Sequence, residues 1–440
     1  MYKNKKIFIL GMARSGYEVA KLLSDYNNEI LITDMKEQDP KQVAELKSKN
    51  VKYIITDNPE ELLDDSYDVL IKNPGIIKTH KCVVKAKELN MEVINELEVA
   101  YAFLNKNSSI IGITGSNGKT TTTTLIYNIL KEAKLDVILG GNIGYPVSSI
   151  VKDVRDNTIL VLEISDHQLL DMYNFKTNIS VLTNLFHNHL DFHGSYENYI
   201  NAKKKIFNNH TKDDIAIINM DNDDCMELTK DIISNKEYFS KNKKCNCYIE
   251  NNDIYYENEK IISIDDIKIK GMHNYENIMC AIMVVKKYNV SNEVIKKILN
   301  TFNGVEHRIE FVKTLNNVDY YNDSKSTNTD STIIAVKSFN KPTILIMGGL
   351  DRGHSFEPLN DYMSNVKLVV CYGETKERIK FWCDSINKEC IVLNDLKEAT
   401  LRSIAEAKKG DIVLLSPACA SWDQYKCFED RGNEFKSYIK

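Results

Sequence analysis

One turn of the chain has residues that could bind a phosphate group: Gly115-Ser116-Asn117-Gly118-Lys119-Thr120-Thr121. The apolar run Ile110–Ile113 before it predicts a buried strand, and apolar residues spaced from Leu125 to Leu130 predict a helix that begins near Thr121. Backbone N–H groups in such a turn and the N-terminus of the next helix attract an anion, while a lysine adds a positive charge. A threonine hydroxyl after the lysine can face a metal ion. We therefore predict a phosphate-binding loop.

The loop departs from the usual eight-residue phosphate-loop pattern. Ile113 occupies the position of its first glycine, and Gly115 lies inside the loop instead. A glycine-rich turn on its own can be no more than a tight connection between a strand and a helix. Because Gly118, Lys119 and Thr120 stand between a clear strand and a clear helix, we favour phosphate binding.

A carboxylate follows a second apolar strand. The segment Thr158–Leu162 is apolar or β-branched and leads directly into Glu163. Mg²⁺ takes hard oxygen ligands together with phosphate oxygens, so a glutamate at a strand end beside a phosphate loop fits a magnesium nucleotide site. The alternative is a solvated glutamate at the end of a strand.

Three histidines follow the strand predicted at Ile179–Asn184: His187, His189 and His193. Such a group can suggest a zinc centre, but no further ligand follows at a familiar spacing. A histidine is more often a hydrogen-bonded residue than a metal ligand, although the position after a sheet strand favours an active-site edge. The helix predicted over Tyr196–Phe207 then carries three lysines: Lys203, Lys204 and Lys205. Two of the three can be ordinary solvated lysines.

The elements that must position these residues read as α/β units. The strand Lys6–Leu10 is followed by a glycine turn and a helix, and the strand Ile30–Thr33 ends at Asp34, as in a Rossmann-like domain. Ala13 replaces the second glycine of the dinucleotide fingerprint, so a nucleotide moiety other than NAD fits at least as well. A turn after a third strand is either part of the ligand edge or a structural Pro-Gly turn: Asn73-Pro74-Gly75.

We predict three domains in this order: a Rossmann-like N-terminal domain (1–97), a central phosphate-loop domain (98–304) and a Rossmann-like C-terminal domain (305–440). Residues 220–270 read as a small antiparallel appendage of the central domain. A helix after it places Asn274 and Asn277 on one face, where the amides could bind a base or cap the helix. In the third domain, three polar loops indicate a shared ligand edge: 323–328, 348–353 and 416–423.

Composition excludes several classes of function. A chain of 440 residues with 43% hydrophobic and 27% charged residues is typical of several soluble globular domains. The net charge of −5 gives no general field for nucleic acid or a membrane surface. The apolar runs have the length of strands, so we expect no membrane insertion. The ten cysteines are scattered without the spacing of a zinc site, which favours reduced thiols in the cytoplasm.

Together, these motifs resemble the Mur ligases, the ATP-dependent amino-acid ligases of peptidoglycan assembly, over the whole chain. The phosphate loop has that family's Thr-Gly-x-x-Gly-Lys-Thr form, which accounts for the displaced glycine. The segment Ser416-Pro-Ala-Cys-Ala-Ser421-Trp-Asp423, with Phe428 and Arg431-Gly-Asn-Glu-Phe, is similar to the D-glutamate-adding branch. The Asp-Asn-Pro-Arg signature of the diaminopimelate- or lysine-adding branch does not occur in this domain.

The resemblance implies a role for each matching residue. ATP would be bound by the loop residues Gly115, Ser116, Asn117, Gly118, Lys119, Thr120 and Thr121, and by Asn274, Asn277, Arg308, Asp323 and Lys325. Two Mg²⁺ ions would be held by Thr120, Glu163, His189 and Lys203, the last as a carbamate, which turns a cation into an anion. The UDP-linked substrate would contact Arg14, Ser15, Asp34, Met35, Lys36, Asn73, Pro74, Gly75, Asn142 and Gln168. D-glutamate would contact Thr327, Arg352, Ser421 and Phe428. The catalytic residues would be Lys119, Glu163, His189 and Lys203.

The implied activity is ligation of D-glutamate to UDP-N-acetylmuramoyl-L-alanine through an acyl phosphate, by a cytoplasmic monomer. One segment departs from the family's Glu-Leu-Ser-Ser-Phe-Gln: here Asp166 and His167 replace a hydroxyl and an aromatic ring. One alternative is a ligase of the same fold that acts on folate or another amino acid, which the Ser416 to Asp423 segment disfavours. Another is a nucleotide-binding regulator, which would need only the phosphate loop.

Overall fold

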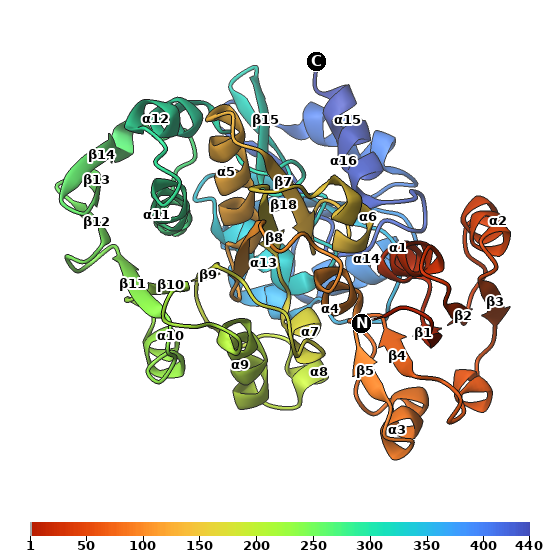
Figure 1. The fold of residues 1–440 in the computed structure, drawn as a ribbon. Helices are drawn as coiled ribbons and strands as arrows, with labels where there is room; N and C mark the ends of the chain where they lie inside the picture. Colours follow the sequence, from red (N-terminus) through yellow and green to blue (C-terminus); the bar gives the residue numbers. More distant parts are fainter. Residues whose placement is uncertain (1) are drawn as a thin grey trace. The chain divides into compact units, whose positions relative to one another are not determined.

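The computed structural model describes residues 2–440, apart from the side chains of Asp191 and Asp330. The chain separates into two compact units, Met1–Phe302 and Asn303–Lys440. The first unit contains two sheets and the second contains one (Figure 1). Most strands are apolar and run parallel, and helices join them, so the predicted α/β fold class is confirmed.

The N-terminal sheet has five parallel strands in the order β3-β2-β1-β4-β5. Their bounds are β1 Lys6–Leu10, β2 Glu29–Asp34, β3 Lys52–Ile55, β4 Val69–Lys72 and β5 Glu92–Ile94. Alternate residues of β1 pack on opposite faces: Ile7 and Ile9 contact the cluster of α1 (Ala13–Ser24), and Phe8 packs with α3 (Lys81–Glu88). The helix α2 spans Pro40–Ser48. Because all strands are parallel, the turns after β1 and β4 lie at one edge.

The central sheet has nine strands in the order β14-β13-β12-β11-β10-β9-β6-β8-β7. The parallel strands are β6 Ser109–Thr114, β7 Val137–Gly141, β8 Ile159–Glu163, β9 Ile179–Leu182, β10 Ile215–Asn219 and β11 Asn235–Ser240, joined by β12 Cys247–Glu250. Only β12, β13 (Asp253–Tyr256) and β14 (Glu259–Ser263) pair antiparallel. The prediction of an antiparallel appendage over 220–270 was therefore wrong for β11. The sequence of β11 is largely polar because only some of its side chains are buried, so it lacks the continuous apolar run that indicates a parallel strand.

The helices of this region lie around the central sheet (Figure 1), and α5 directly follows the phosphate loop. They are α4 Glu96–Tyr101, α5 Lys119–Glu132, α6 Val147–Ile150, α7 Asp166–Leu170, α8 Leu190–His193, α9 Tyr196–Lys204, α10 Asp223–Leu228, α11 Met272–Lys286 and α12 Asn292–Thr301. The predicted helix over Tyr196–Phe207 is α9 followed by a 3₁₀ turn, Lys205–Phe207. Within residues 2–440, no helix combines the length and the apolar character needed to cross a bilayer.

The second unit is a six-stranded sheet in the order β15-β16-β20-β17-β18-β19. Its strands are β15 Glu310–Leu315, β16 Val318–Asn322, β17 Thr343–Gly348, β18 Val366–Tyr372, β19 Cys390–Val392 and β20 Ile412–Leu415. The edge strand β15 is antiparallel to β16 and the others are parallel. The helices are α13 Thr329–Lys337, α14 Lys376–Ser385, α15 Leu396–Glu406 and α16 Phe428–Tyr438. The loops after β16, β17 and β20 therefore end at one edge, as predicted.

His210 gives the first unit a predictable response to acid. Its buried ring lies 2.8 Å from Thr177 Oγ1, 3.1 Å from Ser180 Oγ and 2.8 Å from Ser234 Oγ. Burial lowers the pKa of His210 from 6.5 to about 4. Between these pH values, the ring therefore stays uncharged in the folded protein and binds a proton in the unfolded chain. The free energy of unfolding should therefore fall as the pH decreases from about 6.5 to 4, by up to about 3 kcal/mol.

This prediction is tested by urea unfolding as a function of pH. His210→Asn should flatten the fall in the free energy of unfolding between pH 6.5 and 4, because the titrating ring is absent. His80→Asn is the matched control, since His80 accepts a hydrogen bond from Cys82 N–H at the start of α3 and asparagine also caps helices. An unchanged pH slope in His210→Asn would contradict the prediction.

Candidate functional site

The predicted phosphate loop connects β6 to α5. Gly118 has a φ of +82° and precedes the first helical residue, so α5 begins at Lys119 rather than near Thr121. A Cβ atom at position 118 would lie 2.1 Å from Asn277 Oδ1, in addition to the strain of its backbone conformation. Ile113, at the position of the usual first glycine, is an ordinary residue of β6. The turn that needs glycine lies further along the chain, which explains the displaced pattern.

Residues that follow β9 hold the loop in place. Asn117 N–H donates to Asn184 Oδ1 at 2.9 Å, and Thr183 Oγ1 donates to Asn117 O at 2.6 Å. Ser116 Oγ lies 2.7 Å from the hydroxyl of Tyr199 on α9. Lys119 Nζ donates to Gly115 O at 2.8 Å and to Ser116 O at 2.9 Å, which keeps the ammonium group over the loop. This is the arrangement that phosphate binding requires, with a cation and a helix N-terminus at one point.

Glu163 ends β8 beside the phosphate loop. The strands β6 and β8 pair so that Glu163 is opposite Ile113, two residues before the loop begins at Gly115. The glutamate is buried and its Oε1 accepts a hydrogen bond from Asn142 Nδ2 at 2.8 Å. Thr120 is also buried, in the first turn of α5. A carboxylate and a hydroxyl oxygen at the edge of one parallel sheet are ligands of the type that Mg²⁺ prefers.

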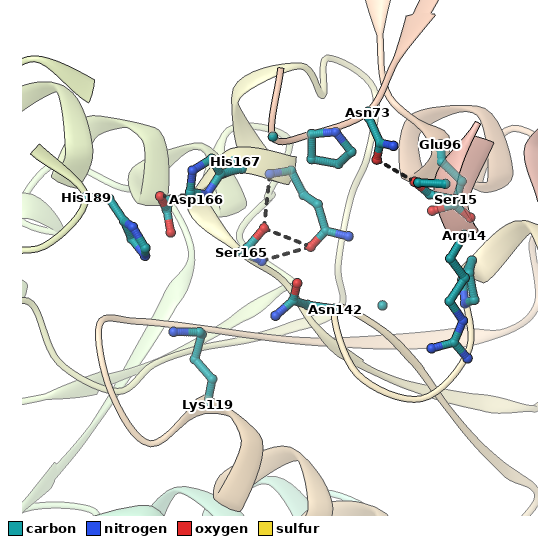
Figure 2. Close-up of a pocket in the computed structure, with 16 residues that line it drawn as sticks. Arg14, Ser15, Asn73, Glu96, Lys119, Asn142, Ser165, Asp166, His167 and His189 are labelled. Atoms are coloured by element: carbon teal, nitrogen blue, oxygen red, sulfur yellow. Dashed lines mark hydrogen bonds and ion pairs between the residues drawn. The ribbon is translucent and has the colours of Figure 1, made fainter. Parts of the chain in front are cut away.

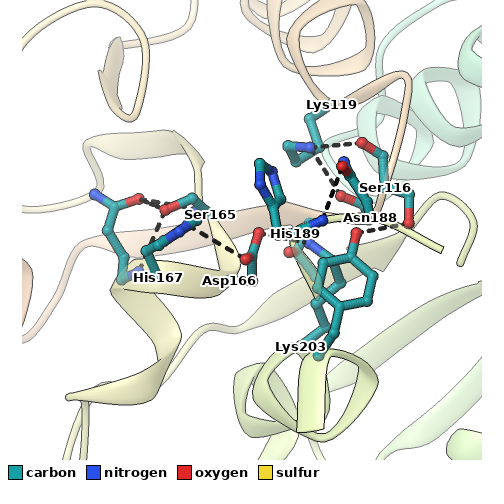
Figure 3. A network of polar contacts seen from close by, with 12 residues as sticks. Ser116, Lys119, Ser165, Asp166, His167, Asn188, His189 and Lys203 are labelled. Carbon is teal, nitrogen blue, oxygen red and sulfur yellow. Dashed lines mark hydrogen bonds and ion pairs between the residues drawn. The ribbon is translucent and has the colours of Figure 1, made fainter. Parts of the chain in front are cut away.

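Asp166 is the centre of a buried polar network (Figure 3). Its Oδ1 lies 3.2 Å from Lys203 Nζ, and its Oδ2 lies 2.7 Å from His193 Nε2 and 3.2 Å from His167 Nδ1. Lys203 is fully buried at 0% exposure, so a counter-charge is required. Its ammonium also lies 4.7 Å from the centre of the Tyr199 ring. The acid that departs from the Mur ligase pattern is therefore the ionic partner of Lys203.

These contacts decide the ionisation of the network. Burial raises the pKa of Asp166, but the charge of Lys203 and the hydrogen bond from His193 outweigh it and hold this pKa below its usual value. Burial lowers the pKa of Lys203, and the carboxylates of Asp166 and Glu163 oppose that shift. Burial also lowers the pKa of His167 to about 4. At neutral pH, Asp166 is ionised and His167 is uncharged.

A pocket of about 550 Å³ extends from the N-terminal sheet to the phosphate loop (Figure 2). Its lining includes many of the residues predicted from the sequence: Arg14, Ser15, Asn73, Pro74, Gly75, Lys119, Asn142, Gln168 and His189. Figure 2 shows Lys119 and His189 on one side of it and Arg14 and Ser15 on the other. Ser15 Oγ donates to Asn73 Oδ1 at 2.8 Å, which fixes one wall. The pocket thus joins the two predicted nucleotide-binding regions.

Three residues predicted to contact the UDP-linked substrate are not in the lining of this pocket: Asp34, Met35 and Lys36. Asp34 accepts hydrogen bonds from Met12 N–H at 2.8 Å and Lys36 N–H at 3.1 Å. The side chain of Met35 is 61% exposed. Asp34 is the last residue of β2, and Met35 and Lys36 follow it at the carboxyl edge of the N-terminal sheet.

The two amides predicted on one face of α11 have different surroundings. Asn277 is buried and its Oδ1 accepts a hydrogen bond from Thr122 Oγ1 at 3.3 Å, so it contacts the helix of the phosphate loop. Asn274 Nδ2 donates to Lys270 O at 2.9 Å at the start of α11. One amide therefore supports the loop, and the other binds the backbone before its own helix.

The other predicted residues belong to the second unit. Asp323 is buried and accepts hydrogen bonds from Ser326, Ser416 and Ile309 N–H; burial raises its pKa to about 6. Lys325 Nζ lies 5.8 Å from the centre of the Phe428 ring. Arg308 is half-buried and Ser421 is buried. Thr327 N–H donates to Lys325 O at 2.9 Å. The guanidinium of Arg352 lies 4.7 Å from the centre of the Trp422 ring.

Arg431 joins the loops of this unit. It is 0% exposed, and it donates to Ser324 O at 2.7 Å, to Ser324 Oγ at 2.9 Å and to Cys419 O at 3.0 Å. One side chain of α16 therefore holds the loop after β16 against the loop after β20. The sequence identified Arg431 only as part of a signature, and it gave no role to Asp166 or His193. The available signal for Asp166 was an acid in the turn that follows an apolar strand, three residues after Glu163.

Three family models match the chain in sequence order. They are "Mur ligase MurD-like, N-terminal domain" over residues 5–95, "Mur ligase middle domain" over 113–285 and "Mur ligase, glutamate ligase domain" over 307–419. The chain belongs to the Mur ligase family, and the three predicted domains and their order are confirmed, while the predicted bounds at residues 97 and 304 stay predictions.

Relatives of similar length are found in Bacillus species. The UDP-N-acetylmuramoylalanine--D-glutamate ligases of Bacillus cereus (strain G9842) and Bacillus anthracis are each 40% identical over 438 residues, which is 99% of this chain and 97% of theirs. The fold is similar to UDP-N-acetylmuramate-alanine ligase MurC of Thermotoga maritima, with a TM-score of 0.62, 18% identity and coverage of 99% and 100%. It is also similar to MurF ligase of Thermotoga maritima in complex with ADP, with a TM-score of 0.57, 16% identity and coverage of 95% and 97%.

Proposed function

We propose that this protein is an ATP-dependent ligase that joins D-glutamate to UDP-N-acetylmuramoyl-L-alanine in peptidoglycan precursor synthesis. The pocket lined by both Lys119 and Arg14 carries this proposal, because it lets a phosphate loop and a nucleotide-substrate domain act on one reacting centre. The 40% identity to ligases of this name, over 99% of the chain, supports the same activity.

The residues divide into three groups by substrate. The ATP phosphates contact the loop from Gly115 to Thr121, and Asn274, Asn277, Arg308, Asp323 and Lys325 complete the nucleotide site. The UDP-linked acceptor lies against the wall formed by Arg14, Ser15 and Asn73 to Gly75. Asn142 and Gln168 contact it nearer the reacting end, and Asp34, Met35 and Lys36 contact its outer end. D-glutamate contacts Thr327, Arg352, Ser421 and Phe428. We assign binding of the UDP-linked acceptor mainly to domain 1–97, binding of ATP mainly to domain 98–304 and binding of D-glutamate to domain 305–440.

The reaction takes place in two steps. The alanyl carboxylate of the acceptor attacks the γ-phosphorus of ATP, forming an acyl phosphate and ADP. The amine of D-glutamate then attacks the acyl carbon, and the tetrahedral species collapses to the amide and phosphate. The Lys119 ammonium and the backbone N–H groups of the loop stabilise negative charge on the transferring phosphate, which is usually the largest contribution in such sites.

The residues around the loop fit a magnesium site. Thr120 and Glu163 would hold one Mg²⁺, since these buried side chains supply a hydroxyl and a carboxylate and the phosphates supply further oxygens. His189 would help to hold a second ion. Bound Mg²⁺ adds positive charge beside the phosphates. Lys203 as a carbamate would also hold the second ion. Burial lowers the pKa of this amine, and a neutral amine is the form that takes up CO₂.

The proposed setting is the cytoplasm, where the protein acts as a monomer on small-molecule substrates. All ten cysteines are free thiols, as expected in a reducing compartment. The proposal includes no nucleic-acid partner, because a net charge of −5 gives no general attraction for nucleic acid.

Phosphate release with different amino acids tests the proposed function. The protein is incubated with ATP, Mg²⁺ and UDP-N-acetylmuramoyl-L-alanine, and D-glutamate should support release about a hundredfold better than L-glutamate or lysine. Omission of the acceptor is the control and should abolish the release. Equal rates with L-glutamate or lysine would contradict the assigned amino acid. No release with any amino acid would favour a nucleotide-binding regulator.

A further inference from the structure

Three thiols meet at one edge of the C-terminal sheet, and none belongs to the residues proposed for ligation. Cys371 lies on β18, Cys383 on α14 and Cys390 on β19. The Sγ atoms of Cys371 and Cys390 are 3.5 Å apart, which is van der Waals contact. The thiol of Cys383 also interacts with that of Cys390 and has its pKa raised by it. Cys390 is therefore the central member of the group.

The register of the two strands explains why these sulfurs meet. In the parallel pair β18–β19, Cys371 is opposite Val392 and Cys390 is opposite Val369. Side chains two residues apart share a face, so both sulfurs lie on the same side of the sheet. The strand β19 has only three residues and lies at the edge of the sheet. A short edge strand moves more easily than a central one, and a shift of about 1.5 Å would bring the sulfurs to bonding distance.

Cys390 is the thiol that a small reagent can reach. It is partly exposed, whereas Cys371 and Cys383 are 0% exposed. The neighbouring thiols of Cys371 and Cys383 lower the pKa of Cys390, and Cys390 raises the pKa of both neighbours. The positive charge of Lys380 acts in the same direction on Cys390. A thiolate is the reactive form of cysteine, so access and charge favour the same residue.

Cys427 provides a comparison within the same unit. Its exposure is also intermediate, but burial, with the carboxylate of Glu429 beside it, raises the pKa of its thiol. Exposure alone would predict equal reactivity for Cys427 and Cys390. The contact with two further thiols distinguishes Cys390.

We propose that Cys390 is a nucleophilic thiol that reacts with a peroxide and then closes a disulfide with Cys371. In the first step, the sulfur of Cys390 attacks one peroxide oxygen, the O–O bond breaks, and the leaving oxygen departs as water after it gains a proton. Cys390 is then a sulfenic acid. In the second step, the sulfur of Cys371 attacks the sulfur of Cys390, the S–O bond breaks, and the hydroxyl group leaves with the proton of Cys371 as water. Two thiols lose two electrons in total, and the peroxide gains them.

The tryptic map of this region separates the three thiols. Cleavage after lysine and arginine places Cys371 in peptide 368–376, Cys383 in 381–388, Cys390 in 389–397 and Cys427 in 427–431. The full-length protein is treated with hydrogen peroxide, free thiols are blocked by alkylation, and the digest is analysed by mass spectrometry without reduction. We expect a disulfide-linked pair of 368–376 and 389–397, with a yield that does not depend on protein concentration.

The rates of thiol loss give a second measurement. In the folded protein, Cys390 should be lost about tenfold faster than Cys427, because it has the lower pKa, and the difference should disappear in urea. Cys390→Ser should protect Cys371 from oxidation. Equal rates for Cys390 and Cys427 in the folded protein would overturn the proposal. A linked pair of 381–388 and 389–397 would overturn the assignment of Cys371 as the partner.

Discussion

Replacement of Lys119 by alanine is expected to lower the rate of phosphate release by about a thousandfold. The ammonium group of Lys119 is the cation of the phosphate loop, held over it by the carbonyl oxygens of Gly115 and Ser116. Without it, the negative charge that develops on the transferring phosphate loses its fixed counter-charge. The rate is measured with ATP, Mg²⁺, acceptor and D-glutamate at saturating concentrations.

The control for this variant lies on the same helix. Lys131 is exposed near the end of α5, where its ammonium contacts the ring of Tyr127, so Lys131→Ala removes a charge without touching the loop. It should retain the rate of the unaltered protein. If Lys119→Ala kept more than about a tenth of the rate, Lys119 would not serve the reaction as a phosphate contact.

Replacement of Lys203 by alanine is expected to leave almost no ligase activity, with partial recovery on addition of small carboxylates such as acetate. The variant removes the amine proposed to become a metal-facing anion, and an added carboxylate can supply that anion. Relative to the unmodified lysine, the variant also leaves Asp166 buried without its ionic partner, and the loss of one member of a buried pair can cost about 3–5 kcal/mol. The free energy of unfolding is therefore measured beside the rate, at the same carboxylate concentrations.

The adjacent lysine separates the two effects. Lys204 forms an ion pair with Asp231, and Lys204→Ala should leave the rate and its response to acetate unchanged. Recovery of the rate by acetate at constant stability would support the carbamate. Full activity of Lys203→Ala without acetate would remove the carbamate from the mechanism.

The strand, loop and helix around Lys119 were predictable because each is encoded in adjacent residues. An apolar run, a glycine that tolerates positive φ and a regular apolar spacing are local signals, and the structure follows them to within a few residues. The helix starts earlier than predicted because the left-handed Gly118 stands immediately before it, which the apolar spacing does not report.

The charge network around Asp166 and the parallel strand β11 were not predictable in this way. Asp166 and Lys203 are 37 residues apart, and only the packing of α7 beside α9 brings their charged atoms together. The strand β11 has a polar sequence, and its direction is decided by pairing with β10 rather than by its own residues. Arg431 likewise acquires its role from two loops that are distant in sequence.

The tyrosine between the phosphate loop and Lys203 has a thermodynamic consequence. The hydroxyl of Tyr199 is 2.7 Å from Ser116 Oγ in the loop, and its ring lies 4.7 Å from Lys203 Nζ. One rigid side chain therefore contacts both sites. If phosphate binding moves this ring, the environment of Lys203 changes with it. Linkage then requires reciprocity. If nucleotide binding changes the equilibrium between two chemical states of Lys203 by some factor, the change between those states must alter the affinity for nucleotide by the same factor.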